Sequence, residues 1–252
     1  MPVYSYMKDI IFEPRTYRNL VHGTDLVSFQ VTIQETDLFI RASKNLKSKA
    51  ERITAKYRRI LERYIERNPV FKTTLEPFTP EDGAPLIVKA MAEAGIAAGV
   101  GPMAAVAGAI AEYVGTELLD YSPEVIIENG GDIFLKSDIK RHISVYAGNS
   151  PLSEVTGLEI DSRDTPLGIC TSSGVIGHSL SYGKADAVVV CAKSAALADA
   201  AATAICNRVK TAEDIESSLA FSETIVEIKG VLVIIGDKAG VRGDIRLVRL
   251  ER

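Results

Sequence analysis

Two oxygen-bearing side chains stand four residues apart in the stretch of the sequence with the most usable chemistry. Asp199 and Thr203 fall within residues 194–209, where Ala, Leu and Ile recur at helical spacing. Residues four apart lie on the same face of a helix. The sequence therefore predicts one helix that presents a carboxylate and a hydroxyl in the same direction, after a buried β-branched strand at residues 188–191.

A small-residue turn precedes that strand. It is formed by Thr171, Ser172, Ser173 and Gly174. Backbone N–H groups and hydroxyls in such a turn are suited to bind a phosphate group. The same residues also suit a plain connection between two elements, and the sequence leaves both interpretations open.

A thiol and an imidazole flank this turn. Cys170 ends the apolar piece before it, and His178 follows Gly174 by four residues. A thiolate stabilised by turn amides and a nearby imidazolium carries sulfur as a persulfide or acts as a nucleophile. The alternative for Cys170 is a small buried apolar residue, which is the interpretation we give to Cys191 and Cys206 in their apolar runs.

A glycine pair separates two further predicted strands, at residues 125–127 and 133–135. The intervening residues are Asn129, Gly130, Gly131 and Asp132. Two glycines at a bend allow the backbone to approach a ligand closely, and Asp132 is placed to orient a bound group. A glycine-rich bulge with a solvated aspartate is the alternative.

Three of these stretches resemble motifs of the ApbE-like superfamily, the FAD:protein FMN transferases, and they follow one another along the chain in the same order as in that family. AVVVCAKSAALADAAATA is similar to that family's final strand-helix segment, in which an Ala-Asp pair precedes a Thr by four residues. EVIIENGGDIFL is similar to its strand ending in N-x-GGD, and TSSG resembles its T-S-G turn. Together the motifs indicate an α/β (α+β mixed) ApbE-like fold with a mixed β-sheet, hairpins and packed helices.

The resemblance also implies a site. Asp199 and Thr203 become the metal candidates, holding a Mg²⁺ that bridges the pyrophosphate of FAD, since Mg²⁺ takes few protein oxygens and completes its shell with phosphates. The implied cofactor-binding residues are Asn129, Gly130, Gly131, Asp132, Thr171, Ser172, Ser173 and Gly174. His178 and Cys170 are the catalytic candidates. The implied activities are Mg²⁺-dependent flavin transfer and FAD pyrophosphate cleavage.

One departure from the family pattern keeps other functions open. The transferases carry an H-I-I-D-P-x-T-G segment, whereas here His178 is followed by Ser179-Leu180-Ser181. This indicates a divergent branch. The alternatives are a cytoplasmic sulfur-handling protein that uses Cys170, and a ligand-binding scaffold without catalysis.

Composition limits the partners. A net charge of −4 and a pI near 5.5 argue against a nucleic-acid surface, so we expect no nucleic acid partner. The small nucleotide-like ligand is what the resemblance to the ApbE-like superfamily implies. Three cysteines without a CxxC pair indicate reduced thiols in the cytoplasm. The N-terminal residues show no export or anchoring signal. Residues 94–111 lack charge, but Pro102 and many Ala and Gly residues argue against a membrane helix.

The remaining pattern predicts the organisation of the chain. Residues 26–42 predict a hairpin with one wet face, and residues 45–68 a long amphipathic helix whose basic side we interpret as a solvated face. The proline-rich residues 71–85 divide a single domain, 1–252, into a hairpin-helix unit, 1–80, and a core with the ligand site, 81–252. Residues 223–236 predict another hairpin. Small-residue helices and edge strands are compatible with a homodimer.

Overall fold

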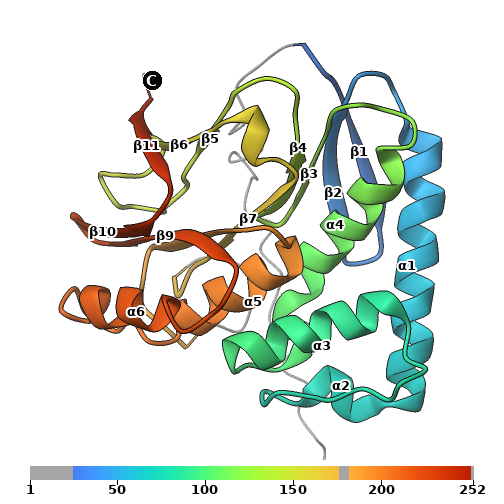
Figure 1. Ribbon diagram of the computed structural model, residues 1–252, viewed down its shortest axis with the longest axis horizontal. Coiled ribbons are helices and arrows are strands. Elements are labelled where there is room, and N and C mark those ends of the chain that lie inside the picture. Colours follow the sequence, from blue (N-terminus) through green and yellow to red (C-terminus); the bar gives the residue numbers. More distant parts are fainter. Residues whose placement is uncertain (1–24, 176–181, 251–252) are drawn as a thin grey trace, which may run out of the picture.

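A central antiparallel sheet organises the protein (Figure 1). The computed structural model describes residues 25–175 and 182–250, so His178 lies outside the described residues. In spatial order the eight strands are β1 (Val27–Ile33), β2 (Thr36–Ala42), β3 (Val125–Asn129), β4 (Asp132–Lys136), β7 (Leu167–Ser172), β8 (Ala187–Ala192), β9 (Ile228–Ile235) and β10 (Lys238–Gly243). Every strand pairing within the described residues is antiparallel. The predicted α/β architecture with hairpins and packed helices is confirmed. The sheet, which was expected to be mixed, is instead antiparallel in every described pairing, since short turns join β1 to β2, β3 to β4 and β9 to β10 and such turns give antiparallel neighbours.

Helices cover one face of this sheet and a second sheet covers the other (Figure 1). The main helices are α1 (Lys47–Arg67), α2 (Pro69–Thr73), α3 (Leu86–Ala98), α4 (Val106–Leu118), α5 (Ala195–Cys206) and α6 (Asp214–Ser222), with short 3-10 turns η2 (Pro102–Ala105) and η3 (Ser162–Asp164). The three-stranded sheet runs in the order β11 (Arg246–Arg249), β6 (Thr156–Ile160) and β5 (Arg141–Ser144).

Strand β8 shows why its sequence is apolar throughout. All six of its residues are buried. Successive side chains point to opposite faces of a strand. Val188 and Val190 therefore join the core beneath the helices, and Val189 and Cys191 join the core beneath the second sheet. A strand covered on both faces has no wet side, so no polar alternation is possible.

Helix α5 packs unusually close to its neighbours, and glycines make this possible. A Cβ placed on Gly108 of α4 would lie 2.2 Å from the carbonyl oxygen of Ala195, and one on Gly168 of β7 would lie 2.3 Å from the Ala195 Cα. These are not separations that real Cβ atoms adopt, so only glycine fits at either position. The backbone of α5 thus lies directly against α4 and the sheet.

The N-terminal hairpin and long helix form as predicted. Strands β1 and β2 are joined at Gln34 and Glu35, and α1 buries one stripe, Ala50, Ile53, Thr54, Leu61 and Tyr64. Strand β2 differs from the expected wet face because α1 covers one side and strand pairing continues to β3, leaving six of its seven residues buried.

The residues between α1 and α3 belong to the same core as the rest. Phe71 is fully buried, stacks edge-on against Phe78, and joins a buried cluster that extends from Phe29 to Val233. Tyr64 donates a hydrogen bond to Glu81 over 2.8 Å. One continuous core therefore includes residues from both sides of the proline-rich stretch.

The uncharged stretch at residues 94–111 is divided between two helices. Helix α3 ends at Gly99, which has a left-handed φ of 71°, and the chain turns through η2 into α4. The two helical pieces meet at 107°. Within the described residues, no single helix has both the length and the apolar composition needed to span a membrane, although this bent pair passes the same test as a pair.

The predicted hairpin at residues 223–236 is wrong. Helix α6 ends at Ser222, a turn follows, and β9 then runs from Ile228 to Ile235 and pairs with β10 instead. Glu227 in the turn has a φ of 73°, which interrupts an extended conformation. The apolar residues that suggested two strands are divided between the turn and a single long strand.

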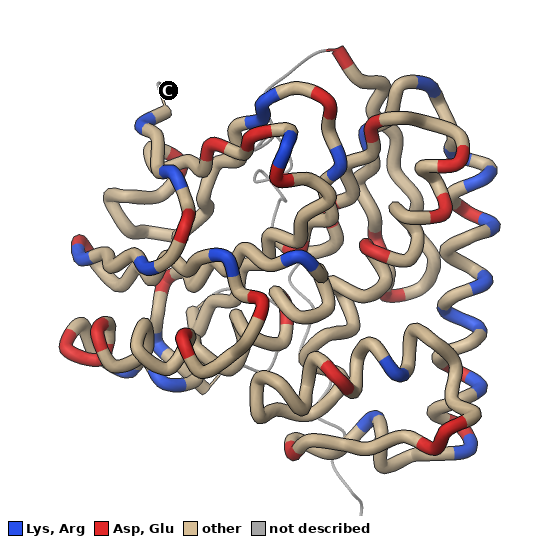
Figure 2. The backbone as a smooth tube through the Cα atoms, viewed as in Figure 1, with Lys and Arg blue, Asp and Glu red and all other residues tan. Residues whose placement is uncertain are grey.

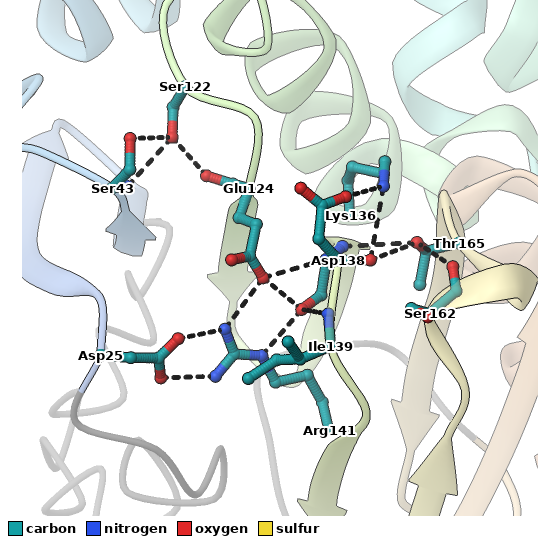
Figure 3. A network of polar contacts seen from close by, with 11 residues as sticks. Asp25, Ser43, Ser122, Glu124, Lys136, Asp138, Ile139, Arg141, Ser162 and Thr165 are labelled. Carbon is teal, nitrogen blue, oxygen red and sulfur yellow. Dashed lines mark hydrogen bonds and ion pairs between the residues drawn. The ribbon is translucent and has the colours of Figure 1, made fainter.

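A polar network joins the start of β1 to the second sheet (Figure 3). The buried Arg141 guanidinium, 2% exposed, donates two hydrogen bonds of 2.7 Å to Asp25. It also donates to Glu124 over 2.9 Å and to Ser137 over 2.8 Å. Each buried charge in this network thus has a partner of opposite sign or a hydroxyl, as burial requires.

Candidate functional site

Three neighbouring strands point polar side chains towards the helices. Asp132 lies two residues before Phe134 in β4, and Ser172 lies two residues after Cys170 in β7. Phe134 and Cys170 belong to the core beneath the helices, and residues two apart share a face of a strand. Asn129 of β3 faces the same way, since its amide donates to the Ala107 carbonyl at the start of α4 over 3.0 Å.

Helix α5 adds the two side chains that the sequence placed on one face. The Asp199 carboxylate accepts a hydrogen bond of 2.9 Å from the backbone N–H of Gly108 in the first turn of α4. Thr203 follows one turn later and is 8% exposed. The positive end of the α4 dipole thus stabilises the Asp199 charge. We call Asn129, Asp132, Ser172, Asp199 and Thr203 the α4–α5 site.

A second carboxylate, which the sequence analysis missed, completes the contact between the two helices. Glu112 of α4 accepts hydrogen bonds from the Ser194 hydroxyl over 2.9 Å and from the backbone N–H groups of Ala195 over 2.7 Å and Ala196 over 3.2 Å. It therefore caps the N-terminus of α5, while Asp199 of α5 binds the first turn of α4. No local signal marks Glu112, because its partners lie more than 80 residues away in the chain.

The electrostatics of the site favour a cation. Burial and the neighbouring Asp199 charge raise the pKa of Asp132 well above its usual value. Burial raises the pKa of Asp199 to about 7, even though hydrogen bonds from Gly108 and Ala107 act in the opposite direction. Two carboxylates that disfavour each other's charge are stabilised by a positive ion between or beside them.

Mg²⁺ fits the donor atoms present. The Oγ of Ser172 is buried and has no hydrogen-bond partner within the described part of the chain. An unpartnered buried hydroxyl is costly unless a ligand satisfies it. Together with the oxygens of Asp199, Thr203 and Asp132 it makes a set of hard donors, which is the chemistry that Mg²⁺ prefers. Among the described residues, no three His, Cys, Asp or Glu side chains form a metal-binding group of their own.

Cys170 lies beside the α4–α5 site but in an environment that opposes a thiolate. It is fully buried, and its thiol donates to the Ala195 carbonyl over 3.3 Å. Burial, followed by the charges of Asp132 and Asp199, raises the pKa of the thiol well above its usual value. These effects all disfavour the charged form that sulfur chemistry requires.

The Gly130-Gly131 pair has a clear structural role. Gly130 and Gly131 form the two-residue turn between β3 and β4, with φ of 70° and 106°, which favours glycine at both positions. Gly131 also donates its N–H to Glu128 over 2.9 Å. The tight turn holds Asn129 and Asp132 opposite each other at the strand ends.

The residues after Ser172 shape the end of β7. Ser173 accepts a hydrogen bond from the Val175 N–H over 3.1 Å, and the Gly174 N–H donates to the Ala185 carbonyl over 2.9 Å. Thr171 points to the opposite face from Cys170 and Ser172. The structure thus brings Ser172 to the α4–α5 site and places Thr171 on the other face of β7, while Ser173 and Gly174 form hydrogen bonds at the end of the strand.

Comparison with known proteins places these observations in a family. Residues 18–224 match the family described as AbpE bacteria. A UPF0280 protein of Methanocaldococcus jannaschii is 44% identical over 88% of this chain and 93% of its own length. A UPF0280 protein of Methanopyrus kandleri is 42% identical over 86% and 91%.

Solved structures share the fold at low identity. A mutant of the flavin transferase ApbE from Vibrio cholerae is 16% identical with a TM-score of 0.57, covering 86% of this chain and 97% of that one. The apo flavinyl transferase ApbE of Pseudomonas stutzeri is 12% identical with a TM-score of 0.57, covering 86% and 93%. The ApbE protein of Thermotoga maritima is 11% identical with a TM-score of 0.54 over 87% and 97%.

Proposed function

The chain belongs to the AbpE bacteria family, and from this premise we propose that it binds FAD with Mg²⁺ at the α4–α5 site and cleaves the pyrophosphate. The phosphoanhydride bond between the FMN and AMP halves breaks, AMP leaves, and the FMN phosphoryl group passes to a hydroxyl of a protein or to water. The first acceptor makes the protein a flavin transferase and the second an FAD pyrophosphatase.

The convergence of Asp132 and Asp199 carries the proposal. They come from a strand and a helix separated by more than 60 residues, yet each carboxylate has a raised pKa in the same buried region. Burying two acids together is unfavourable without a cation. A bound cation would offset that cost, which supports a metal-binding role.

Each residue then has a task. Asp199 and Thr203 would hold Mg²⁺, with Asp132 and Ser172 beside them. A bound Mg²⁺ supplies neutralisation of the charge that develops on the pyrophosphate. The amide hydrogen bond from Gly108 fixes the orientation of the Asp199 carboxylate, and Glu112 fixes the start of α5.

Flavin fluorescence tests the proposal directly. FAD titrated into the native protein should be quenched with micromolar affinity in Mg²⁺, about −8 kcal/mol, and not in EDTA. Asp199→Asn keeps an oxygen for the Gly108 N–H but removes the charge, so Mg²⁺-dependent affinity should fall about 100-fold, equal to about 2.7 kcal/mol. Asp237→Asn, at an exposed turn, is the matched control and should bind as the native protein does.

Two further measurements separate the activities and ligand classes. Release of AMP shows pyrophosphate cleavage, and the FMN product is then sought free in solution or covalently on added protein. ADP in competition shows whether the site recognises the flavin or only the phosphates. Equal FAD affinity in Mg²⁺ and EDTA, or in the native protein and Asp199→Asn, contradicts the proposal.

A further inference from the structure

Helix α1 has a net positive charge, whereas the rest of the protein has a net negative charge. Its 21 residues contain eight Lys or Arg and three Glu, a net charge of +5. Because the whole chain carries −4, the remaining residues carry −9. Figure 2 shows the Lys and Arg positions following α1 along one edge of the molecule. The protein is therefore strongly polarised, with its positive charge concentrated on one helix.

Most cations of α1 are also segregated around the helix axis. With 3.6 residues per turn, six of them fall within an arc of about 80°. They are Lys49, Arg52, Lys56, Arg59, Arg63 and Arg67, which we call the cationic stripe. The three Glu of the helix lie on the adjoining arc, so no acid interrupts the stripe. It extends for about 27 Å at 1.5 Å per residue.

Four members of the stripe are available for a partner. Arg52, Arg59, Arg63 and Arg67 are all exposed. Across residues 25–175 and 182–250, none of them forms an ion pair with a carboxylate. Arg58, on the same helix but outside the stripe, contrasts with them, since it pairs with Glu35 and Glu62 and is only 14% exposed. The two ion pairs hold Arg58 within the fold, whereas the four stripe arginines keep their charges free of any carboxylate in the described part of the chain.

The spacing of the stripe matches a second helix. From Lys49 to Arg63 the intervals alternate between three and four residues, which is the heptad spacing along which two helices pack. Carboxylates at the same spacing on a partner helix would lie opposite Arg52, Arg59 and Arg63, whose positions lie seven and four residues apart within this pattern. Arginine is suited to such contacts because its planar fork binds a carboxylate through two hydrogen bonds.

A depression beside the stripe argues for a protein over a nucleic acid. It has a volume of about 420 Å³ and lies between α1 and the end of α4. Lys49, Arg52 and Lys56 line one side, and Glu117, Asp120 and Tyr121 line the other. Lys56 pairs with Glu117 and Lys49 lies 3.7 Å from the centre of the Tyr121 ring, so of the stripe cations at this depression only Arg52 forms no ion pair or ring contact among the described residues. A continuous chain of phosphates would meet the carboxylates of the far wall. A protein helix can present acids to the stripe and a basic or aromatic side chain to that wall.

We propose that the cationic stripe is the docking surface for an acidic α-helix of a partner protein, with Glu or Asp at the same three-and-four spacing. The stripe lies on a different helix from Asp199, and the inference does not depend on flavin binding. Because the contacts are exposed ion pairs, binding is sensitive to ionic strength.

Synthetic peptides provide the probe. A fluorescein-labelled peptide as long as α1, with Glu at the stripe spacing in an Ala and Gln background, is titrated with the protein and followed by anisotropy. A peptide of the same composition, shuffled so that Glu surrounds the helix, tests the spacing. A single-stranded RNA with the same number of charges tests whether the stripe instead recognises phosphate.

Two variants with the same net charge isolate the stripe. The stripe variant combines Arg52→Gln, Arg59→Gln, Arg63→Gln and Arg67→Gln. The control variant removes four exposed cations elsewhere, through Lys140→Gln, Arg163→Gln, Lys238→Gln and Arg249→Gln. Thermal unfolding of both verifies that each remains folded.

The native protein should bind the patterned peptide at low salt and the shuffled peptide more weakly. Affinity for the patterned peptide should fall at least about tenfold in the stripe variant and less than about twofold in the control variant. It should also fall when the salt concentration is raised to about 0.5 M. The proposal is overturned by no binding at low salt, by equal binding of the two peptides, by equal loss in both variants, or by tighter binding of the RNA through the same arginines.

Discussion

Gly108 and Asp199, 91 residues apart in the chain, are joined by a 2.9 Å hydrogen bond from the Gly108 N–H to the Asp199 carboxylate. A Cβ on Gly108 would lie 2.9 Å from the Cβ of Asp199 as well as 2.2 Å from the Ala195 oxygen. The orientation of the proposed metal ligand therefore depends on the absence of a single methyl group on the facing helix.

Gly108→Ala should lower the free energy of unfolding by about 1–3 kcal/mol, because the added methyl group forces α4 and α5 apart. Alanine has a higher helix propensity than glycine, so a lower free energy of unfolding would mean that the steric cost exceeds the gain in helix propensity. Gly83→Ala, with no atom within 4 Å of the new Cβ, should change the same free energy by less than about 0.5 kcal/mol. Urea unfolding compares them, and an equal effect of the two would contradict the packing argument.

Glu112→Gln should weaken Mg²⁺-dependent FAD binding without contacting the ligand. The glutamine retains one acceptor oxygen but loses the charge that caps α5 at Ser194, Ala195 and Ala196. Loss of a helix cap costs about 0.5–2 kcal/mol of stability. Thermal unfolding measures the loss of stability. FAD titration in Mg²⁺ measures the loss of affinity that we expect when α5, and with it Asp199, is held less firmly. Glu93→Gln, on the exposed side of α3, is the control and should alter neither quantity.

Arg141→Met should destabilise the protein by about 3–5 kcal/mol near pH 7, because it leaves the Glu124 carboxylate partly buried without its cation. Lys136→Met removes an ion pair with the exposed Asp138 and should cost at most about 1 kcal/mol. Urea unfolding at pH 7 makes the comparison. Lys136 and Asp138 lie at the exposed edge of the network in Figure 3, so similar losses in the two variants would mean that burial of the Arg141 ion pair contributes little.

The ion pair between Arg141 and Glu124 predicts a pH dependence of stability with a definite sign. Burial alone raises the pKa of Glu124, but hydrogen bonds from Ser137 and Arg141 outweigh it and hold the pKa below its usual value. A carboxyl whose pKa is lower in the folded state stabilises the fold above its unfolded pKa, and this stability is lost as the pH falls through the folded pKa. The native protein should therefore lose more stability than Arg141→Met as the pH is lowered below about 4.5. Parallel curves for the two proteins would contradict this linkage.

The cysteines should be unreactive in the folded protein. All three are buried, and the pKa of Cys191 is raised by burial to about 12, while that of Cys170 is raised well above its usual value. Iodoacetamide labelling followed by peptide mass mapping should find Cys170 no faster than Cys191, and both at least about 100-fold slower than after unfolding. Selective labelling of Cys170 would instead favour the sulfur-handling alternative.

Several elements could be predicted because their causes are local. Asp199 and Thr203 share a face of α5 since four residues make about one helical turn. The all-apolar β8 and the Gly130-Gly131 turn follow equally from neighbouring residues. The hairpin expected at residues 223–236 was wrong because its apolar residues have no clear period, and packing of α6 against β9 and β10 decided their structure.

The sequence by itself determined which side chains the chain presents and how they are spaced within each helix, strand and turn, including the stripe along α1 and the motifs of the family. Only the tertiary structure decided that Asp132 lies close enough to Asp199 for its pKa to be raised, that Glu112 caps α5, and that Cys170 is buried near the Asp132 and Asp199 carboxylates. The reason is physical. Helical and strand periodicity depend on residues a few positions apart, whereas desolvation and charge interactions depend on distances in space between segments that are far apart in the chain.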